Sequence, residues 1–347
     1  MNRVLAVRLD SDGDVLITGP AIRALANTAD RLDVLVSPAG RAAAELLPGI
    51  AELFTFDAPW SGYRPASVDQ SQIRALTRNL RRRRYSRAVI FTSFHQSPLP
   101  MALLAKLARI PFVAATSVDY PGSLLDLRHQ RPAGHEVEAA LDLAVAAGGR
   151  LPAGDDGRLR VKTPAAPALP LPAGRYVVVH PGASVPSRSL QPAHAESIVN
   201  ALVGAGWPVV VTGGPADRGL AAATAGQHAM DLSGRTDLPT LAAVIAGAEC
   251  LVVGNTGPAH LAAAVGTPVV SLFSPVVPLE RWAPYGVPTI VLGDQQQACR
   301  DSRARDCPIP AHPCLSSITP DEVVTAVDRL ANSPASAVKA VAKAVGP

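Results

Sequence analysis

Residues 250–273, CLVVGNTGPAHLAAAVGTPVVSLF, contain the alternation that decides the fold. An apolar run (250–255) leads into a turn of Gly, Asn, Thr and Pro, then an alanine-rich segment (258–266) and a second apolar run (268–273). Apolar runs on both sides of a helical segment predict two parallel strands, because a crossover helix returns the chain to the same end of a sheet. The segment therefore predicts a parallel sheet covered by helices.

The same alternation occurs in both halves of the chain. In the first half, the predicted strands are 4–9, 32–37, 52–56, 87–93 and 112–117, and the predicted helices are 15–27, 41–47, 72–84 and 100–109. In the second half, the predicted strands are 176–180, 208–213, 250–255 and 268–273, and the predicted helices are 193–204, 238–248, 258–266 and 318–331. The fold class predicted is α/β, with two Rossmann-like, doubly wound lobes.

A segment rich in Pro and Gly, residues 151–174, separates the two series. Such a density of Pro and Gly does not hold a regular element. The segment predicts a linker between an N-terminal lobe, 1–150, and a C-terminal lobe, 175–317. Residues 318–347 are expected to form a last helix and a tail that frays from Ser333.

Composition narrows the classes of function. The chain has 347 residues, of which 48% are hydrophobic and 4% aromatic, and a formal net charge of +4. This mildly basic balance fits anionic ligands and is too weak to predict nucleic-acid binding. The arginine run 78–87 is either a solvated helix end or a contact for a phosphorylated or membrane-held acceptor. No signal peptide or membrane-spanning run is recognisable, so we expect a cytoplasmic monomer with peripheral contact at the inner membrane face.

The turn 254–258, between a predicted strand and a predicted helix, has the properties of an anion site. Thr256 or Gly257 is placed to cap the helix, and Pro258 fits its first turn. Backbone N–H groups at a helix start, together with the helix dipole, attract a phosphate, and His260 adds a further donor. The competing interpretation is a capped helix with nothing bound.

A second turn of this kind, HPGASVPSRS (180–189), follows the first predicted strand of the C-terminal lobe. Gly182 permits a close approach of the backbone, Ser184 offers a hydroxyl, and Arg188 offers a guanidinium fork. Two such turns in one lobe predict a diphosphate site more specifically than either turn alone. In a doubly wound sheet, such a site lies beyond the carboxyl ends of the strands.

The acidic turn RLDSDGD (8–14) follows the first predicted strand and allows three interpretations. Its Asp-x-Asp pattern resembles a metal-binding motif that some glycosyltransferases carry. A calcium loop is excluded, because Val15 stands where that loop needs Gly and Ala21 stands where it needs an acidic ligand. The favoured interpretation is a general base at the start of a helix, for which Asp14 is the candidate. A plain helix cap is the alternative.

Three late cysteines, Cys299, Cys307 and Cys314, lie near His312. Their spacing matches no C-x2-C zinc ribbon, and we expect loop thiols packed against the lobe, with no metal site and no cofactor. The chain has no G-x-S-x-G nucleophile elbow. A nicotinamide dehydrogenase is the least favoured class, because no G-x-G-x-x-G follows the first predicted strand.

Four segments together resemble the heptosyltransferase-like glycosyltransferase family 9, over about Arg3 to Leu330. They are RLDSDGDVLITGPAIRAL, HPGASVPSRS, VTGGPADR and NTGPAHLAAAVGTPVVSLF, and the stretch SGRTDLP resembles the family more loosely. The resemblance implies a GT-B architecture, in which two lobes face each other across a cleft. It also implies an inverting transfer of a sugar from a nucleotide diphosphate without a metal ion.

The resemblance also implies roles for individual residues. Asp14 matches the base and Arg188 the basic residue at the donor phosphates, so these two are the catalytic candidates. The full set of donor-binding candidates is Gly182, Ser184, Arg188, Asp217, Thr236, Asn255, Thr256, Gly257 and His260. Asp217 matches a ribose contact and Thr236 a stretch near the base of the nucleotide. An ADP-sugar, with heptose as its sugar, is the favoured donor.

The acceptor implied by the resemblance is a lipopolysaccharide core or another cell-envelope glycan or glycolipid. The N-terminal lobe offers four candidate contacts for it: Arg128, His129, Arg131 and His135. The family often has Asp where this chain has Asn255, so a non-catalytic nucleotide-binding derivative stays open. A sugar-nucleotide epimerase on the same fold is the other alternative.

Overall fold

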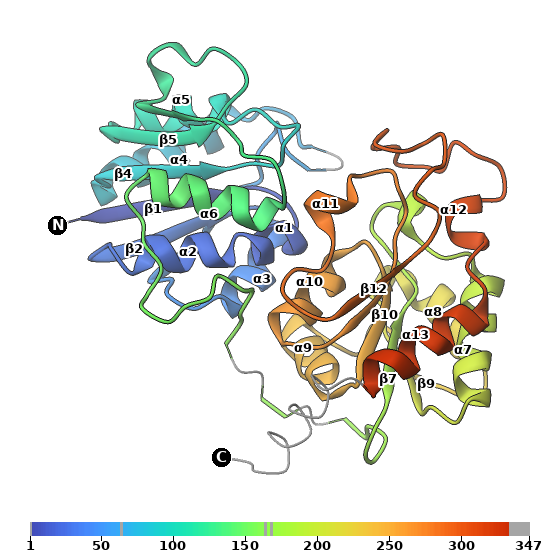
Figure 1. The fold of residues 1–347 in the computed structure, drawn as a ribbon. Coiled ribbons are helices and arrows are strands. Elements are labelled where there is room, and N and C mark those ends of the chain that lie inside the picture. Colours follow the sequence, from blue (N-terminus) through green and yellow to red (C-terminus); the bar gives the residue numbers. More distant parts are fainter. Residues whose placement is uncertain (1, 63–64, 163–164, 167–168, 333–347) are drawn as a thin grey trace. The chain divides into compact units, whose positions relative to one another are not determined.

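The computed structural model describes residues 2–62, 65–162, 165–166 and 169–332 (Figure 1). The chain divides into two compact units, Met1–Lys162 and Thr163–Pro347. The division falls within the segment 151–174 that was predicted as the linker. The predicted tail from Ser333 lies outside the described residues.

The first unit is built on a sheet of parallel strands in the order β3-β2-β1-β4-β5-β6. The strands are β1 (Arg3–Arg8), β2 (Arg31–Val36), β3 (Glu52–Thr55), β4 (Arg87–Phe91), β5 (Phe112–Thr116) and β6 (Leu127–His129). The chain winds outward from β1 in one direction and then from β4 in the other. This is the doubly wound α/β topology that the sequence predicted, with its switch point between β1 and β4.

Helices cover both faces of this sheet. They are α1 (Asp12–Ile17), α2 (Gly19–Ala26), α3 (Arg41–Leu46), α4 (Gln70–Arg83), α5 (Leu99–Leu107) and α6 (Glu136–Ala146). Leu5 and Val7 of β1 belong to one buried cluster with side chains of α4 and α5. In Figure 1, α2 and α6 lie in front of the sheet and α4 lies behind it. The strand β6 and the helix α6 were not predicted.

The prediction of one helix over 15–27 was wrong, because two helices meet at Thr18. Thr18 donates its N–H to the carbonyl of Val15 at 3.1 Å and its hydroxyl to the carbonyl of Asp14 at 2.8 Å, which tightens and ends α1. Pro20 has no N–H to continue the α-helical ladder across the junction. At the other end of α1, Ser11 is the cap and Asp12 the first residue, so Asp14 lies at the third position and does not begin the helix.

The first part of the predicted linker packs on the first unit. Arg23 of α2 holds Asp155 with two bonds, Nε to Oδ2 at 2.7 Å and Nη2 to Oδ1 at 2.9 Å. The hydrogen bond from the Arg23 guanidinium lowers the pKa of Asp155 to about 2. Leu159 is buried, and Lys162 donates its N–H to the carbonyl of Leu46 at 2.8 Å. Residues 151–162 have no helix or strand, yet they belong to the first unit.

The second unit contains a parallel sheet in the order β12-β11-β10-β7-β8-β9. Its strands are β7 (Val177–His180), β8 (Val209–Val211), β9 (Met230–Asp231), β10 (Cys250–Gly254), β11 (Val269–Leu272) and β12 (Thr289–Leu292). The switch point lies between β7 and β10, so this unit is also doubly wound, as predicted. The edge strands β9 and β12 were not predicted, because β9 has only two residues and β12 is half-buried throughout.

The helices of the second unit are α7 (Pro192–Gly204), α8 (Arg218–Ala225), α9 (Leu238–Gly247), α10 (Gly257–Ala264), α11 (Leu279–Trp282), α12 (Pro313–Ser316) and α13 (Pro320–Ala331). Helix α13 begins at the predicted Thr319 cap, whose N–H donates to Glu322 Oε2 at 2.7 Å. Two short 3-10 helices, η3 (Pro186–Arg188) and η4 (Pro215–Asp217), follow β7 and β8. Among the described residues, no helix combines the length and the apolar character needed to cross a membrane.

Candidate active site

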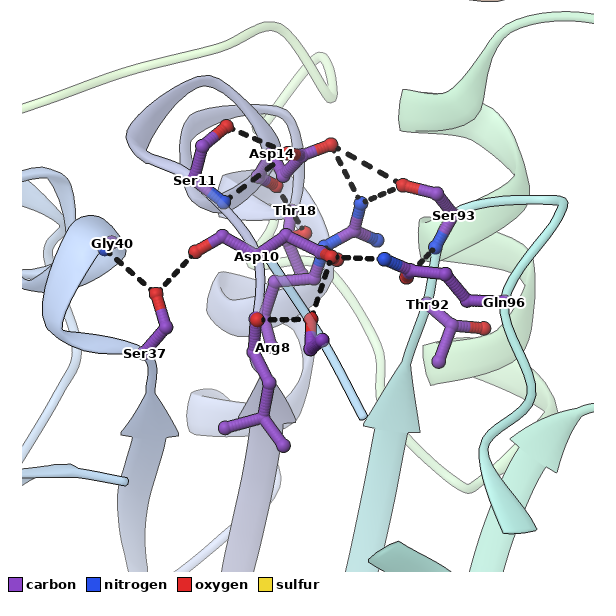
Figure 2. Close-up of polar contacts among 12 residues, drawn as sticks. Arg8, Asp10, Ser11, Asp14, Thr18, Ser37, Gly40, Thr92, Ser93 and Gln96 are labelled. Atoms are coloured by element: carbon purple, nitrogen blue, oxygen red, sulfur yellow. Dashed lines mark hydrogen bonds and ion pairs between the residues drawn. The ribbon is translucent and has the colours of Figure 1, made fainter. Parts of the chain in front are cut away.

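A buried arginine organises the carboxyl end of β1 in the first unit. The side chain of Arg8 is 3% exposed, and its Nε lies 2.8 Å from Asp10 Oδ2. Its Nη2 donates to Asp14 Oδ1 at 3.0 Å and to Ser93 Oγ at 2.9 Å (Figure 2). One guanidinium therefore holds the carboxylates of Asp10 and Asp14, as its planar fork of donors allows. From sequence, no role was assigned to Arg8. The available signal was a single basic residue that ends an apolar strand, just before three aspartates.

Asp14, the predicted base, is fixed on both sides of its carboxylate. Ser93 donates its hydroxyl to Oδ1 at 3.3 Å, and Ser11 donates its hydroxyl to Oδ2 at 2.8 Å. The Asp14 side chain is 19% exposed, so a ligand can reach it while its orientation is held. Ser11 also donates its N–H to Oδ2 at 3.3 Å, so about four acceptor positions of the carboxylate are occupied and an incoming hydroxyl has to replace one of these donors.

Asp10, which shares Arg8 with Asp14, lines a small pocket. Gln96 donates its amide to Asp10 Oδ1 at 2.5 Å and accepts the N–H of Ser93 at 3.0 Å. The pocket measures about 330 Å³ including its open mouth. Its polar and aromatic lining comes from Asp10, Trp60, Ser61, Phe91, Thr92, Gln96 and Ser97. Trp60, Ser61 and Gln96 were missed from sequence, because they lie on loops far along the chain from Asp10.

The electrostatics of this cluster depend on burial. Desolvation raises the pKa of Asp10, the Arg8 charge opposes that rise, and the neighbouring Asp14 adds to it. Burial alone would lower the pKa of Arg8, but the charges of Asp10, Asp14 and Glu136 outweigh it and raise the pKa. Arg8 therefore stays charged, and its charge opposes the protonation of Asp10 that burial favours.

The four predicted acceptor contacts have structural partners in the first unit. Arg128 donates to the carbonyls of Ser117 and Val118, at 3.0 and 2.7 Å. His129 lies 2.7 Å from Asp142, and His135 accepts the N–H of Val137 as the cap of α6. Arg128 and His129 thus belong to the edge strand β6, and His135 caps α6.

Arg131 is the acceptor candidate that reaches towards the Asp14 cluster. It pairs with buried Glu136 at 2.7 Å and donates to the carbonyl of Thr92, a residue of the pocket, at 2.8 Å. Glu136 in turn acts electrostatically on Arg8. A contact between Arg131 and an acceptor stays a prediction.

In the second unit, the donor-binding candidates gather at the carboxyl ends of neighbouring strands. Gly182, Ser184 and Arg188 follow β7, and Asp217 follows β8. Thr236 lies after β9, and Asn255, Thr256, Gly257 and His260 follow β10. The order β10-β7-β8-β9 places these four loops side by side along one edge of the sheet. This is the edge where ligands of doubly wound sheets bind.

Two close approaches show that these loops touch. A Cβ on Gly182 would lie 2.6 Å from Cγ of Asp217, so the carboxylate of Asp217 lies directly against the glycine. A Cβ on Gly254 would lie 2.6 Å from the carbonyl oxygen of Arg188. Glycine is thus required at both positions for the loops after β7, β8 and β10 to meet.

The residue before Arg188 is held at all three of its polar groups. Ser187 is fully buried, donates its N–H to the carbonyl of Arg305 at 2.9 Å, and donates its hydroxyl to the carbonyl of Ala304 at 2.6 Å. His312 Nε2 lies 3.0 Å from the Ser187 carbonyl, which accepts from it. His312 adopts a left-handed conformation, with φ of 54° and ψ of 53°. The segment 304–312 therefore supports the turn that presents Arg188.

The start of α10 offers fewer backbone donors than the sequence suggested. Thr256 is the cap, and its N–H donates to the carbonyl of Gly254 at 2.9 Å. Pro258 has no N–H, so the N–H of Gly257 and the hydroxyl of Thr256 are what this helix start can present to an anion. His260 is buried one turn further on.

Asn255 faces the neighbouring strand rather than open space. Its amide donates to the carbonyl of Ser274 at 3.1 Å and accepts the N–H of Ser274 at 3.2 Å. A carboxylate could accept this N–H but could not donate to the carbonyl. The amide therefore joins the ends of β10 and β11, which gives a structural reason for Asn at this position.

The late cysteines are separate thiols. Cys299 and Cys314 are buried, and Cys307 is partly exposed. Burial raises the pKa of Cys314 to about 11. Within the ranges that the structure describes, no group of three or more His, Cys, Asp or Glu side chains is arranged to hold a metal ion.

Comparison with known proteins agrees with this architecture. A curated relative, lipopolysaccharide heptosyltransferase 3 of Escherichia coli, is 32% identical over 164 residues, which are 45% of this chain and 46% of that protein. The match thus spans about half of the relative. A family 9 glycosyltransferase of Veillonella parvula has a TM-score of 0.75 at 18% identity, covering 95% of this chain and 97% of that one.

Two solved E. coli proteins share the fold as well. ADP-heptose lipopolysaccharide heptosyltransferase II has a TM-score of 0.71 at 21% identity, covering 95% of this chain and 98% of that one. Heptosyltransferase WaaC with ADP-2-deoxy-2-fluoro heptose has a TM-score of 0.66 at 20% identity, covering 94% of this chain and 99% of that one. Identities this low establish the shared GT-B fold of two Rossmann-like lobes and nothing about substrate.

The family itself is established by sequence. The sequence model of one protein family, glycosyltransferase family 9 (heptosyltransferase), matches residues 73–311, which is well over half of the chain. The match begins after Asp14 and includes the donor-binding candidates of the second unit. The chain belongs to glycosyltransferase family 9.

Proposed function

We propose that this protein transfers a heptose from ADP-heptose to a hydroxyl of a cell-envelope glycan or glycolipid, with inversion at the anomeric carbon and without a divalent ion. The family supports glycosyl transfer. The donor is suggested by WaaC, which has been solved with ADP and with an ADP-heptose analogue. The acceptor is suggested by the lipopolysaccharide heptosyltransferase that matches 45% of this chain.

In the proposed reaction, Asp14 accepts the proton of the acceptor hydroxyl as its oxygen attacks the anomeric carbon. The bond between that carbon and the phosphate oxygen breaks, and ADP leaves with the bonding electrons. Direct attack from the opposite side inverts the carbon. The negative charge that develops on the diphosphate is stabilised by Arg188, by Gly257 N–H and by the Thr256 hydroxyl, with His260 as a further candidate.

One observation carries the catalytic part of this proposal: the contact of the buried Arg8 guanidinium with Asp14. Arg8 Nη2 lies 3.0 Å from Asp14 Oδ1, and Ser93 completes a triangle with both. The arrangement places a cation against an accessible carboxylate and orients that carboxylate at the switch point of the sheet. Asp14 also completes a capping box with Ser11, as the helix-cap alternative predicts, and its contacts with Arg8 and Ser93 go beyond that capping role.

The test is the substitution Asp14→Asn, which keeps the shape of the side chain and removes its basicity. Transfer from ADP-heptose should fall by about 10²–10⁴-fold, the usual contribution of a general base, while the Kd for ADP stays the same. Asp12→Asn is the matched control: Asp12 lies in the same turn, but its carboxylate accepts the N–H of Ala43 at 2.9 Å. The control should retain transfer.

Unchanged turnover in Asp14→Asn, or an equal loss in both variants, would remove Asp14 from the mechanism. Arg188→Ala tests the donor side separately and should weaken ADP binding and slow transfer by about 10²–10³-fold. Turnover measured with and without EDTA tests the metal-free part, and a loss in EDTA that magnesium restores would refute it.

A further inference from the structure

The outer face of α4 carries an unusual concentration of positive charge. Within residues 70–84 the exposed charged side chains are all arginines: Arg74, Arg78, Arg81, Arg82 and Arg84. Arg74, Arg78 and Arg82 recur every four residues and so share one side of the helix. Of the residues that the structure describes, none forms an ion pair with these five side chains.

Arg83 shows the contrast within the same helix. It turns inward, pairs with Glu52 at 2.7 Å and lies 3.9 Å above the ring of Phe54. An arginine required by the fold thus has partners here, and the five outer ones do not. Like charges four residues apart destabilise a helix, and Arg74 and Arg78 lie too far from its C-terminus to gain from the dipole. Arg74 and Arg78 therefore oppose the stability of α4, whereas Arg81 and Arg82 lie in its last turn and gain from the dipole. Arginines kept at a cost to the helix point to a partner outside the chain.

Helix α5 lies beside α4 and adds apolar surface. Leu76 and Leu80 of α4 and Leu104 of α5 belong to one core cluster, so the two helices cover the same face of the sheet. On the outer side of α5, Leu103 is 47% exposed and Leu107 is 55% exposed. These leucines are four residues apart and lie on one side of the helix.

We propose that this arginine–leucine face (Arg74, Arg78, Arg81, Arg82, Arg84, Leu103 and Leu107) docks on an anionic membrane surface. Guanidinium groups pair with lipid phosphates, and leucines enter the boundary between headgroups and acyl chains. A soluble polyanion would use the arginines alone and leave the leucines exposed. The proposal goes beyond the proposed function, since it assumes nothing about donor or acceptor.

The size of the effect follows from the charge. A basic residue near an anionic leaflet contributes about fivefold to binding (about 1 kcal/mol), and this contribution weakens with salt. Arg78→Gln combined with Arg82→Gln should therefore lower vesicle binding by about 25-fold. The double variant Leu103→Gln with Leu107→Gln should still bind vesicles at low salt. It should lose vesicle binding at high salt, where the arginines are screened.

The experiment is flotation of the full chain with vesicles of equal parts phosphatidylglycerol and phosphatidylcholine, and with vesicles of phosphatidylcholine alone. The matched control, Arg150→Gln with Arg329→Gln, removes two exposed arginines elsewhere on the chain. The protein should float with the anionic vesicles only, and the control pair should bind as the parent does. Thermal unfolding of each variant checks that the fold is retained, which we expect because all the replaced side chains are exposed.

Three results would overturn the proposal: no flotation of the parent chain, equal flotation with neutral vesicles, or an equal loss in the control pair. Binding to a soluble polyanion such as heparin, without binding to either vesicle, would assign the face to another class of partner. Binding of ADP in solution should be the same in all variants, so failure here is distinct from failure of the proposed transfer reaction.

Discussion

Replacing His312 with leucine should weaken donor binding without any direct contact with the donor. His312 donates to the carbonyl of Ser187, the residue before Arg188, at 3.0 Å, and both residues are buried. Leucine fills similar space but cannot donate, so the buried carbonyl loses its partner. A buried polar group left without a partner costs about 1–3 kcal/mol. The turn can relieve this cost only by moving, and Arg188 moves with it.

We expect His312→Leu to lower the unfolding free energy by about 1–3 kcal/mol. The Kd for ADP should rise by about tenfold, which corresponds to 1.4 kcal/mol. Thermal unfolding and calorimetric titration with ADP measure the two effects. His312→Gln is the control, because it retains an N–H donor of similar reach and should restore most of the affinity.

A double-mutant cycle separates positioning from general destabilisation. If His312 acts through Arg188, His312→Leu should have little further effect on ADP binding in an Arg188→Ala background. Additive losses in that background would refute the reasoning. So would an unchanged Kd in His312→Leu, or a loss in His312→Gln as large as that in His312→Leu. If Arg188→Ala alone leaves ADP binding unchanged, the fault lies in the proposed donor site and not in the support from His312.

Further predictions concern the same unit. Asn255→Asp puts a carboxylate 3.1 Å from a backbone carbonyl in a buried site. Burial should raise the pKa of the new carboxyl, so the protonated group can donate at pH 5 but not at pH 8. The free energy of unfolding should therefore fall by about 2 kcal/mol at pH 8 and by less at pH 5, which chemical unfolding at both pH values measures. Gly254→Ala should lower stability and ADP affinity, because its Cβ would lie 2.6 Å from the Arg188 carbonyl oxygen, whereas Gly204→Ala, with open space around it, should not. Burial lowers the pKa of His180 to about 4. The unfolded chain therefore binds the extra proton first, and stability should fall by about 3 kcal/mol as the pH drops from 6.5 to 4, a loss that His180→Gln should remove in acid unfolding.

Local sequence patterns were sufficient for the α/β class and for the two doubly wound sheets. Strands buried on both faces, such as β1 and β10, are continuous apolar runs whatever their neighbours are. The edge strands β6, β9 and β12 were harder to recognise, because β9 and β12 lack such a run and β6 contains Arg128 and His129. Long helices with strong caps, such as α13, were also predictable, whereas the break at Thr18 depends on a few hydrogen bonds at one junction.

The candidate site divides in the same way. Asp14, Arg188 and the turn before α10 could be singled out from sequence, because each follows an apolar strand and carries a side chain suited to protons or phosphates. What only the tertiary structure decided is how these groups are held. Ser93 meets Arg8 across 85 positions of sequence, and His312 meets Ser187 across 125. Such contacts arise when strand pairing closes long loops, and no local pattern records which polar side chains that closure brings together.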